Sequence, residues 1–133
     1  MKKISIILVI IWMIVIFMFS NMNGTISGMQ SNGIVAKIAD VINYTGNIDT
    51  LRLIVRKCAH FTEYLILGIL VLNACKYNNA KNMIMLSILI CILYACTDEL
   101  HQIFIEDRVG NILDASIDTL GSLCGIGIAK LRK

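Results

Sequence analysis

The chain has 133 residues, of which 57% are hydrophobic and 16% are charged, and it carries a formal net charge of +3. This composition excludes an ordinary soluble domain, because such domains are about 25% charged. The small basic excess can be explained by membrane topology, so it gives no reason to invoke nucleic-acid binding. We therefore predict a single membrane domain that covers residues 1–133.

Four apolar stretches predict four membrane-spanning helices, because a span needs about 20 predominantly apolar residues. Lys2 and Lys3 precede the first stretch as they would in a signal peptide, but no small-x-small cleavage site follows it, so an uncleaved helix is favoured. The predicted fold is all-α, an integral membrane four-helix bundle. Its predicted spans cover residues 4–21, 55–76, 82–102 and 111–130, each to within about two residues.

The segment between the first two spans is too polar to cross a membrane and too long for a simple turn. Apolar residues recur at helical spacing from Ile34 to Ile42, which predicts a short amphipathic helix in this outer loop, on the outer leaflet or against the bundle. A further helix is predicted to begin near Asn47 or Asp49, whose side chains can cap free backbone amides. This helix should continue without a break into the second span.

Basic residues predict the orientation, because short cytoplasmic loops retain Lys and Arg. An N-terminus inside the cell leaves seven of the 12 basic residues in the cytoplasm and five outside, with all nine acidic residues outside. We therefore expect a multi-pass protein with both termini in the cytoplasm.

Seven ionisable residues lie in or beside the apolar stretches, where each charge costs roughly 2.5 to 3.5 kcal/mol on insertion scales. Residues three or four apart share one face of an α-helix. The polar residues therefore form three stripes, one on each of the last three spans, and all three are predicted at the outer helix ends. Glu99 points about a quarter turn from its stripe. The seven residues are His60, Glu63, Asp98, Glu99, His101, Asp114 and Asp118.

The fourth span also carries a signal for close helix packing. Asp114 and Asp118 continue into Gly121 and Gly125, and this small-x-x-x-small spacing lets helix backbones approach each other. The carboxylates on this span are therefore predicted to point into the bundle.

Carboxylates and histidines at membrane depth suit general acid and base chemistry. The candidate catalytic residues are His60, Glu63, Asp98, His101, Asp114 and Asp118. Guanidinium and ammonium groups can hold a phosphate or a carboxylate. The candidate substrate-binding residues are Arg56, Lys57, Tyr64, Gln102 and Arg108. Oxygen ligands together with a histidine can also hold a divalent metal such as magnesium or manganese. The candidate metal ligands are Asp98, Glu99, Asp114 and Asp118.

Two motifs resemble those of the VanZ-like family, which is named for an accessory factor in teicoplanin resistance. The first is RKCAHFTEY, from Arg56 to Tyr64, and the second is YACTDELHQ, from Tyr94 to Gln102. The resemblance extends over essentially the whole chain. Two departures are Met22, where the family often has glutamine, and Glu106-Asp107, where it often has a proline-glycine pair.

This resemblance implies a bacterial, four-helix protein of the cytoplasmic membrane that is linked to lowered susceptibility to lipoglycopeptides. One interpretation is an enzyme that processes an envelope lipid or a lipid-linked cell-wall precursor at the outer leaflet. A second is a non-catalytic binder or shield that alters glycopeptide access. A small proton-coupled transporter is a third, although a carrier normally has its site near the midplane. The expected partners are membrane lipids and either the precursor or the glycopeptide.

A structural interpretation also stays open, in which the polar groups only bond the helices to each other. Arg56 with Glu63, or Arg108 with Asp114, would then form ion pairs within the bundle. A stable bundle does not need seven such costly groups at one level, so this interpretation is weaker for the whole set than for any one residue.

Overall fold

The computed structural model of the protein describes residues 2–21, 24–104 and 112–132. These residues form five helices and contain no strand, which confirms the predicted all-α fold. The helices are α1 (Lys2–Ser20), α2 (Gly24–Ile42), α3 (Ile48–Tyr77), α4 (Met83–Gln102) and α5 (Ile112–Leu131).

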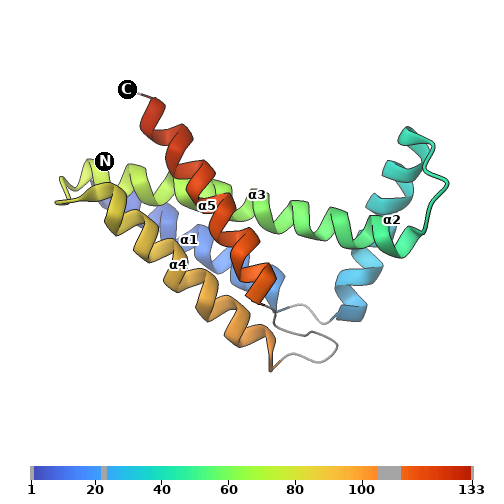
Figure 1. Ribbon diagram of the computed structural model, residues 1–133. Helices are drawn as coiled ribbons and strands as arrows, with labels where there is room; N and C mark the ends of the chain where they lie inside the picture. Colours follow the sequence, from blue (N-terminus) through green and yellow to red (C-terminus); the bar gives the residue numbers. More distant parts are fainter. Residues whose placement is uncertain (1, 22–23, 105–111, 133) are drawn as a thin grey trace.

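Four of these helices, α1, α3, α4 and α5, are long and apolar enough to cross a membrane. Helices of 20 residues are about 30 Å long, which matches the hydrocarbon core of a bilayer. The start of α1, the turn between α3 and α4, and the end of α5 lie at one end of the bundle (Figure 1). The end of α1, the end of α4 and the start of α5 lie at the other end. We call this second end the polar end of the bundle.

The start of α3 follows from a capping residue. Asn47 has an extended backbone, and its side-chain oxygen accepts a hydrogen bond from the backbone N–H of Asp49 at 2.8 Å. Such an N-cap contributes about 1 kcal/mol to the helix. The helix then runs for 30 residues without a break, which confirms the predicted single element. Its first part extends beyond the bundle, to the place where α2 lies (Figure 1).

The helix between the first two spans is longer than the sequence predicts. It was expected over the apolar repeat from Ile34 to Ile42, whereas α2 covers 19 residues and begins at Gly24. Within the described part of the chain, α3 is the only helix that α2 contacts. Val35 is buried, while Ile34 and Val41 are exposed. The early part of α2 lacks apolar periodicity, so the pattern of apolar residues could not predict it.

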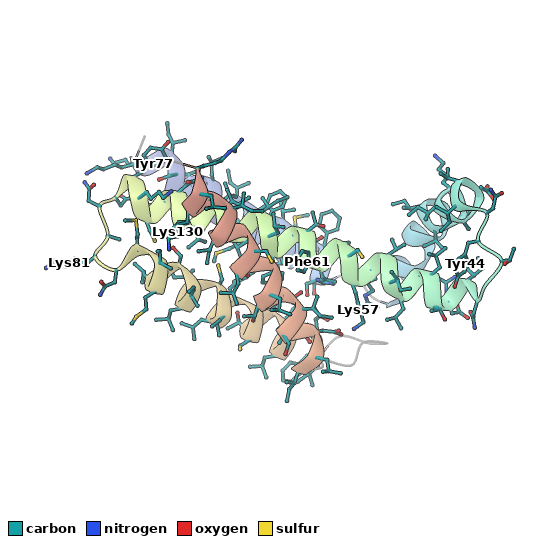
Figure 2. The ribbon with its side chains drawn as sticks, turned by 45° about the horizontal axis from the view of Figure 1, so that its top comes forward. Tyr44, Lys57, Phe61, Tyr77, Lys81 and Lys130 are labelled. Atoms are coloured by element: carbon teal, nitrogen blue, oxygen red, sulfur yellow. The ribbon has the colours of Figure 1, made fainter. Side chains whose placement is uncertain are left out.

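The pair of helices that approach each other most closely is α3 and α5. A Cβ atom on Gly121 would collide with the backbone carbonyl of Phe61, and one on Gly125 would collide with that of Leu65. Gly68 makes the corresponding approach from α3 toward the backbone of α5. Figure 2 shows α5 crossing α3 at Phe61. The predicted small-x-x-x-small contact is confirmed, and it brings two backbones together without side chains between them.

Two hydrogen bonds from aromatic side chains to backbone carbonyls attach α1 to the other helices. The indole N–H of Trp12 donates to the backbone carbonyl of Glu63 on α3 at 2.9 Å. The hydroxyl of Tyr94 on α4 donates to the backbone carbonyl of Met13 at 2.6 Å. Polar donors inside a membrane need an acceptor, because there is no water to replace it. These bonds therefore fix α1 against α3 and α4.

Candidate functional site

A cluster of ionisable side chains lies where α3, α4 and α5 meet. His60, Asp98 and Asp118 each offer a ligand atom, and these atoms lie within 4.8 Å of one another. Asp98 is 3% exposed and Asp118 is 1% exposed, while His60 is partly buried. We call these three residues the polar cluster. Three separate regions of the sequence supply it, so one member of each predicted stripe does converge.

The close approach of α3 and α5 explains why two members of the polar cluster meet. Gly121 packs against Phe61, so the preceding turn of α5 brings Asp118 beside the residue before Phe61, which is His60. A larger side chain at Gly121 would separate the two helices and widen the polar cluster. The glycine spacing is therefore a condition for the site as well as for the fold.

Several buried oxygen atoms of the polar cluster have no hydrogen-bond donor. Among the described residues, neither carboxylate oxygen of Asp118 has a partner, and Oδ1 of Asp98 has none. The hydroxyl of Tyr64, which is fully buried, lies within electrostatic range of Asp98. A buried polar atom without a partner costs about 1–3 kcal/mol. A purely structural role for these groups would therefore lower the stability of the fold.

The other oxygen of Asp98 belongs to a small network at the polar end. Nε2 of Gln102 donates to Oδ2 of Asp98 at 3.3 Å and to Oγ of Ser20 at 3.0 Å. Ser20 is fully buried at the end of α1. Ser20 is not among the predicted site residues, although a polar residue that directly ends an apolar run is a signal for it. The network links α1 to α4 and holds the Asp98 carboxylate in place.

Two further carboxylates lie near the polar cluster. Glu99 is 8% exposed, and among the neighbouring charges it acts most strongly on Asp118. Helical phase left its direction open, and the contact of α4 with α5 places it inside the bundle. Glu63 is half-buried, with its Oε2 atom 3.7 Å from Nδ1 of His60. The surroundings of the polar cluster are therefore rich in acidic groups.

The second histidine lies apart from the polar cluster. Nε2 of His101 is 3.2 Å from the side-chain oxygen of Asn21, and its ring centroid is 4.8 Å from that of Phe17. Both partners belong to the last turn of α1 or directly follow it. The predicted stripe of α4 is thus divided, with Asp98 directed to the cluster and His101 to α1.

Asp114 is also separated from the polar cluster, because it pairs with a lysine. Nζ of Lys57 donates to Oδ1 of Asp114, and both side chains are 38% exposed. Figure 2 shows Lys57 one turn before the crossing near Phe61. The pair therefore joins α3 to α5 on the side of the cluster that is nearer the start of α5. Arg56, which precedes Lys57 on α3, is half-buried.

Apart from His101, which lies against α1, the predicted site residues that the structure describes fall into two groups. The polar cluster and its immediate neighbours comprise His60, Glu63, Tyr64, Asp98, Glu99, Gln102 and Asp118. The basic edge comprises Arg56 and Lys57, with Asp114 bound to the latter. Arg108 lies outside the described residues, and with it the predicted Arg108–Asp114 ion pair. The arrangement offers proton-transfer groups in the interior and cations at the edge, which suits a ligand with an anionic head.

Comparison with protein families gives a match over nearly the full chain. The model of a family described as VanZ/LLP1 matches residues 5–133. Comparison with curated proteins gives no match, and comparison with solved structures gives none either.

Proposed function

The chain belongs to the VanZ/LLP1 family, and on this premise we propose that its polar cluster binds and processes the head of a cell-envelope lipid or a lipid-linked cell-wall precursor. Family membership together with four apolar helices makes it a VanZ-like membrane protein linked to glycopeptide resistance. The proposed location is the outer leaflet of the bacterial cytoplasmic membrane, with both termini in the cytoplasm. One observation carries the proposal: His60, Asp98 and Asp118 meet within 4.8 Å inside apolar helices.

The depth of the polar cluster supports a lipid head as its ligand. Asp98 precedes the end of α4 by four residues, and Asp118 follows the start of α5 by six. At 1.5 Å per residue these positions are about 6 and 9 Å from the helix ends. The bilayer midplane is about 15 Å from either surface of the hydrocarbon core. Asp98 therefore lies within reach of a lipid head at the headgroup boundary, whereas Asp118 lies slightly nearer to the midplane, the depth typical of a carrier site.

The basic residues near the polar cluster fit a lipid with an anionic head. Arg56 and Lys57 lie on the part of α3 that precedes the polar cluster, where they can hold a phosphate or carboxylate. A head bound there brings its hydroxyl or leaving group toward His60 and Asp98. These two residues are the proposed acid and base, and Gln102 holds Asp98 through its hydrogen bond.

The test compares envelope lipids and cell-wall precursors by mass spectrometry in cells with wild-type protein, with Asp98→Asn, or with none. The asparagine keeps the shape of the side chain and an oxygen to accept from Gln102, but it cannot act as a base. We expect the wild-type protein to change the precursor profile and Asp98→Asn to lose that change. Asp49→Asn, whose side chain is 78% exposed, is the matched control and should behave as wild type.

Two outcomes would overturn the enzymatic proposal. Full resistance in His60→Ala and Asp98→Asn variants that reach the membrane would show that neither residue takes part. An unchanged chemical profile with altered binding of a labelled glycopeptide would identify the protein as a shield.

A further inference from the structure

We propose that His60, Asp98 and Asp118 form a binding site for one divalent cation, of the manganese or zinc class. The proposal rests on the geometry of the three side chains and does not depend on the lipid substrate. While His60 and Asp98 hold an ion they are not free to act as acid and base, so proton transfer in the proposed function would then fall to a water bound to the ion. Ligand atoms on one ion, at bond lengths of about 2.1 Å, lie roughly 3 to 4.2 Å apart. The three ligand atoms here lie within 4.8 Å of one another, so a small side-chain rotation is enough to close the site.

The unsatisfied oxygens are the second, independent observation. Both oxygens of Asp118 and Oδ1 of Asp98 are buried without a hydrogen-bond donor among the described residues, and they belong to the group that converges with His60. Buried polar groups are normally paired, and a buried charge is normally matched by another charge or by a metal. A bound cation would satisfy these oxygens together.

Charge balance favours a divalent ion. Metal ligation requires deprotonated carboxylates, so Asp98 and Asp118 would supply two negative charges, and with a neutral His60 a divalent cation brings the sum over these three ligands to zero. The nearest described lysine on this part of α3, Lys57, is already bonded to Asp114. Glu99 adds further negative potential at Asp118, which favours a cation there. The polar cluster is thus electrostatically suited to a cation.

Neighbouring side chains have the positions of outer-shell partners in metal sites. Gln102 donates to Oδ2 of Asp98 and leaves Oδ1 without a donor. The carboxylate of Glu63 lies 3.7 Å from Nδ1 of His60, so a small movement would bring the two to the hydrogen-bond distance of carboxylate–histidine–metal arrangements. One imidazole with two carboxylates suits manganese or zinc, because imidazole favours zinc and carboxylates favour manganese.

The experiment measures Mn²⁺ binding to the full-length protein, purified in detergent and treated with a chelator. Free Mn²⁺ is followed by electron paramagnetic resonance during titration, and Zn²⁺ is tested by competition. We expect one Mn²⁺ per chain for the wild-type protein. Asp118→Asn and His60→Gln should each weaken binding by about tenfold or more, since loss of an outer-shell partner alone costs about 10–100-fold.

Asp114→Asn is the matched control, because it removes a carboxylate one turn earlier on α5 that is bound to Lys57 instead. It should bind Mn²⁺ as the wild-type protein does. Circular dichroism and gel filtration verify that each variant is folded. As a second readout, Mn²⁺ should raise the melting temperature of the wild-type and Asp114→Asn proteins but not that of Asp118→Asn.

Three results would overturn the inference. The first is that the wild-type protein binds neither Mn²⁺ nor Zn²⁺, in which case Asp118 is a structural carboxyl. Unaltered binding in Asp118→Asn is the second result, and equal weakening by Asp114→Asn is the third. The measurement contains no lipid substrate, so a failure of the proposed lipid chemistry leaves its result unaffected.

Discussion

Gly125→Ala should destabilise the protein through a single added methyl group. The new Cβ would meet the carbonyl of Leu65, lying 2.9 Å from its carbon atom and 3.2 Å from the backbone nitrogen of Ile69. Cβ atoms essentially never approach other atoms closer than 3.0 Å. The obstacle is backbone, so no side chain can rotate away and α5 must move from α3. Overpacking of this kind costs about 1–3 kcal/mol.

Gly127→Ala is the matched control on the same helix. A Cβ at Gly127 meets no atom of the described residues within 4 Å. Alanine favours a helix over glycine by about 1 kcal/mol at either position, so this gain cancels when the two variants are compared. The free energy of unfolding, measured by SDS titration in mixed micelles with circular dichroism, should be about 1–3 kcal/mol lower for Gly125→Ala than for Gly127→Ala. Equal values would refute the backbone-to-backbone contact.

Two further substitutions test the hydrogen bonds around the site. Trp12→Phe keeps an aromatic ring but removes the donor to the carbonyl of Glu63, so the free energy of unfolding should fall by about 1 kcal/mol in the same SDS titration. An unchanged value would contradict this bond. Gln102→Glu replaces the donor to Asp98 by a buried negative charge and should lower the free energy of unfolding by about 3 kcal/mol. Wild-type stability in this variant would show that the network is dispensable.

Most of the helical framework could be predicted because it follows from local rules. The Asn47 cap, the uninterrupted apolar run behind it and the Gly121 and Gly125 spacing each depend on residues close in sequence. The convergence of three polar stripes followed from helical phase together with alternating span direction. Only one member of each stripe, however, belongs to the polar cluster itself.

The remaining features depend on which helix packs against which face. Helical phase grouped His101 with Asp98 and left the direction of Glu99 open, whereas in the structure His101 contacts Phe17 on α1 and Glu99 is buried near Asp118 on α5. The pairing of Asp114 with Lys57 likewise depends on where α5 crosses α3. Ser20 could not be assigned because its partner, Gln102, is distant in sequence. Helical phase predicts the direction of each side chain around the axis of its own helix. It does not predict which other helix lies in that direction.

The unequal lengths of the spanning helices have a consequence for the choice of membrane. At 20 residues, α4 and α5 are about 30 Å long and match the hydrocarbon core, whereas the 30 residues of α3 make about 45 Å. Hydrophobic matching is therefore set by the shorter spans, and two of these, α4 and α5, carry Asp98 and Asp118. A thinner or thicker bilayer should tilt these two helices and change the depth of both carboxylates. Activity in vesicles of graded acyl-chain length should then pass through a maximum near the native thickness.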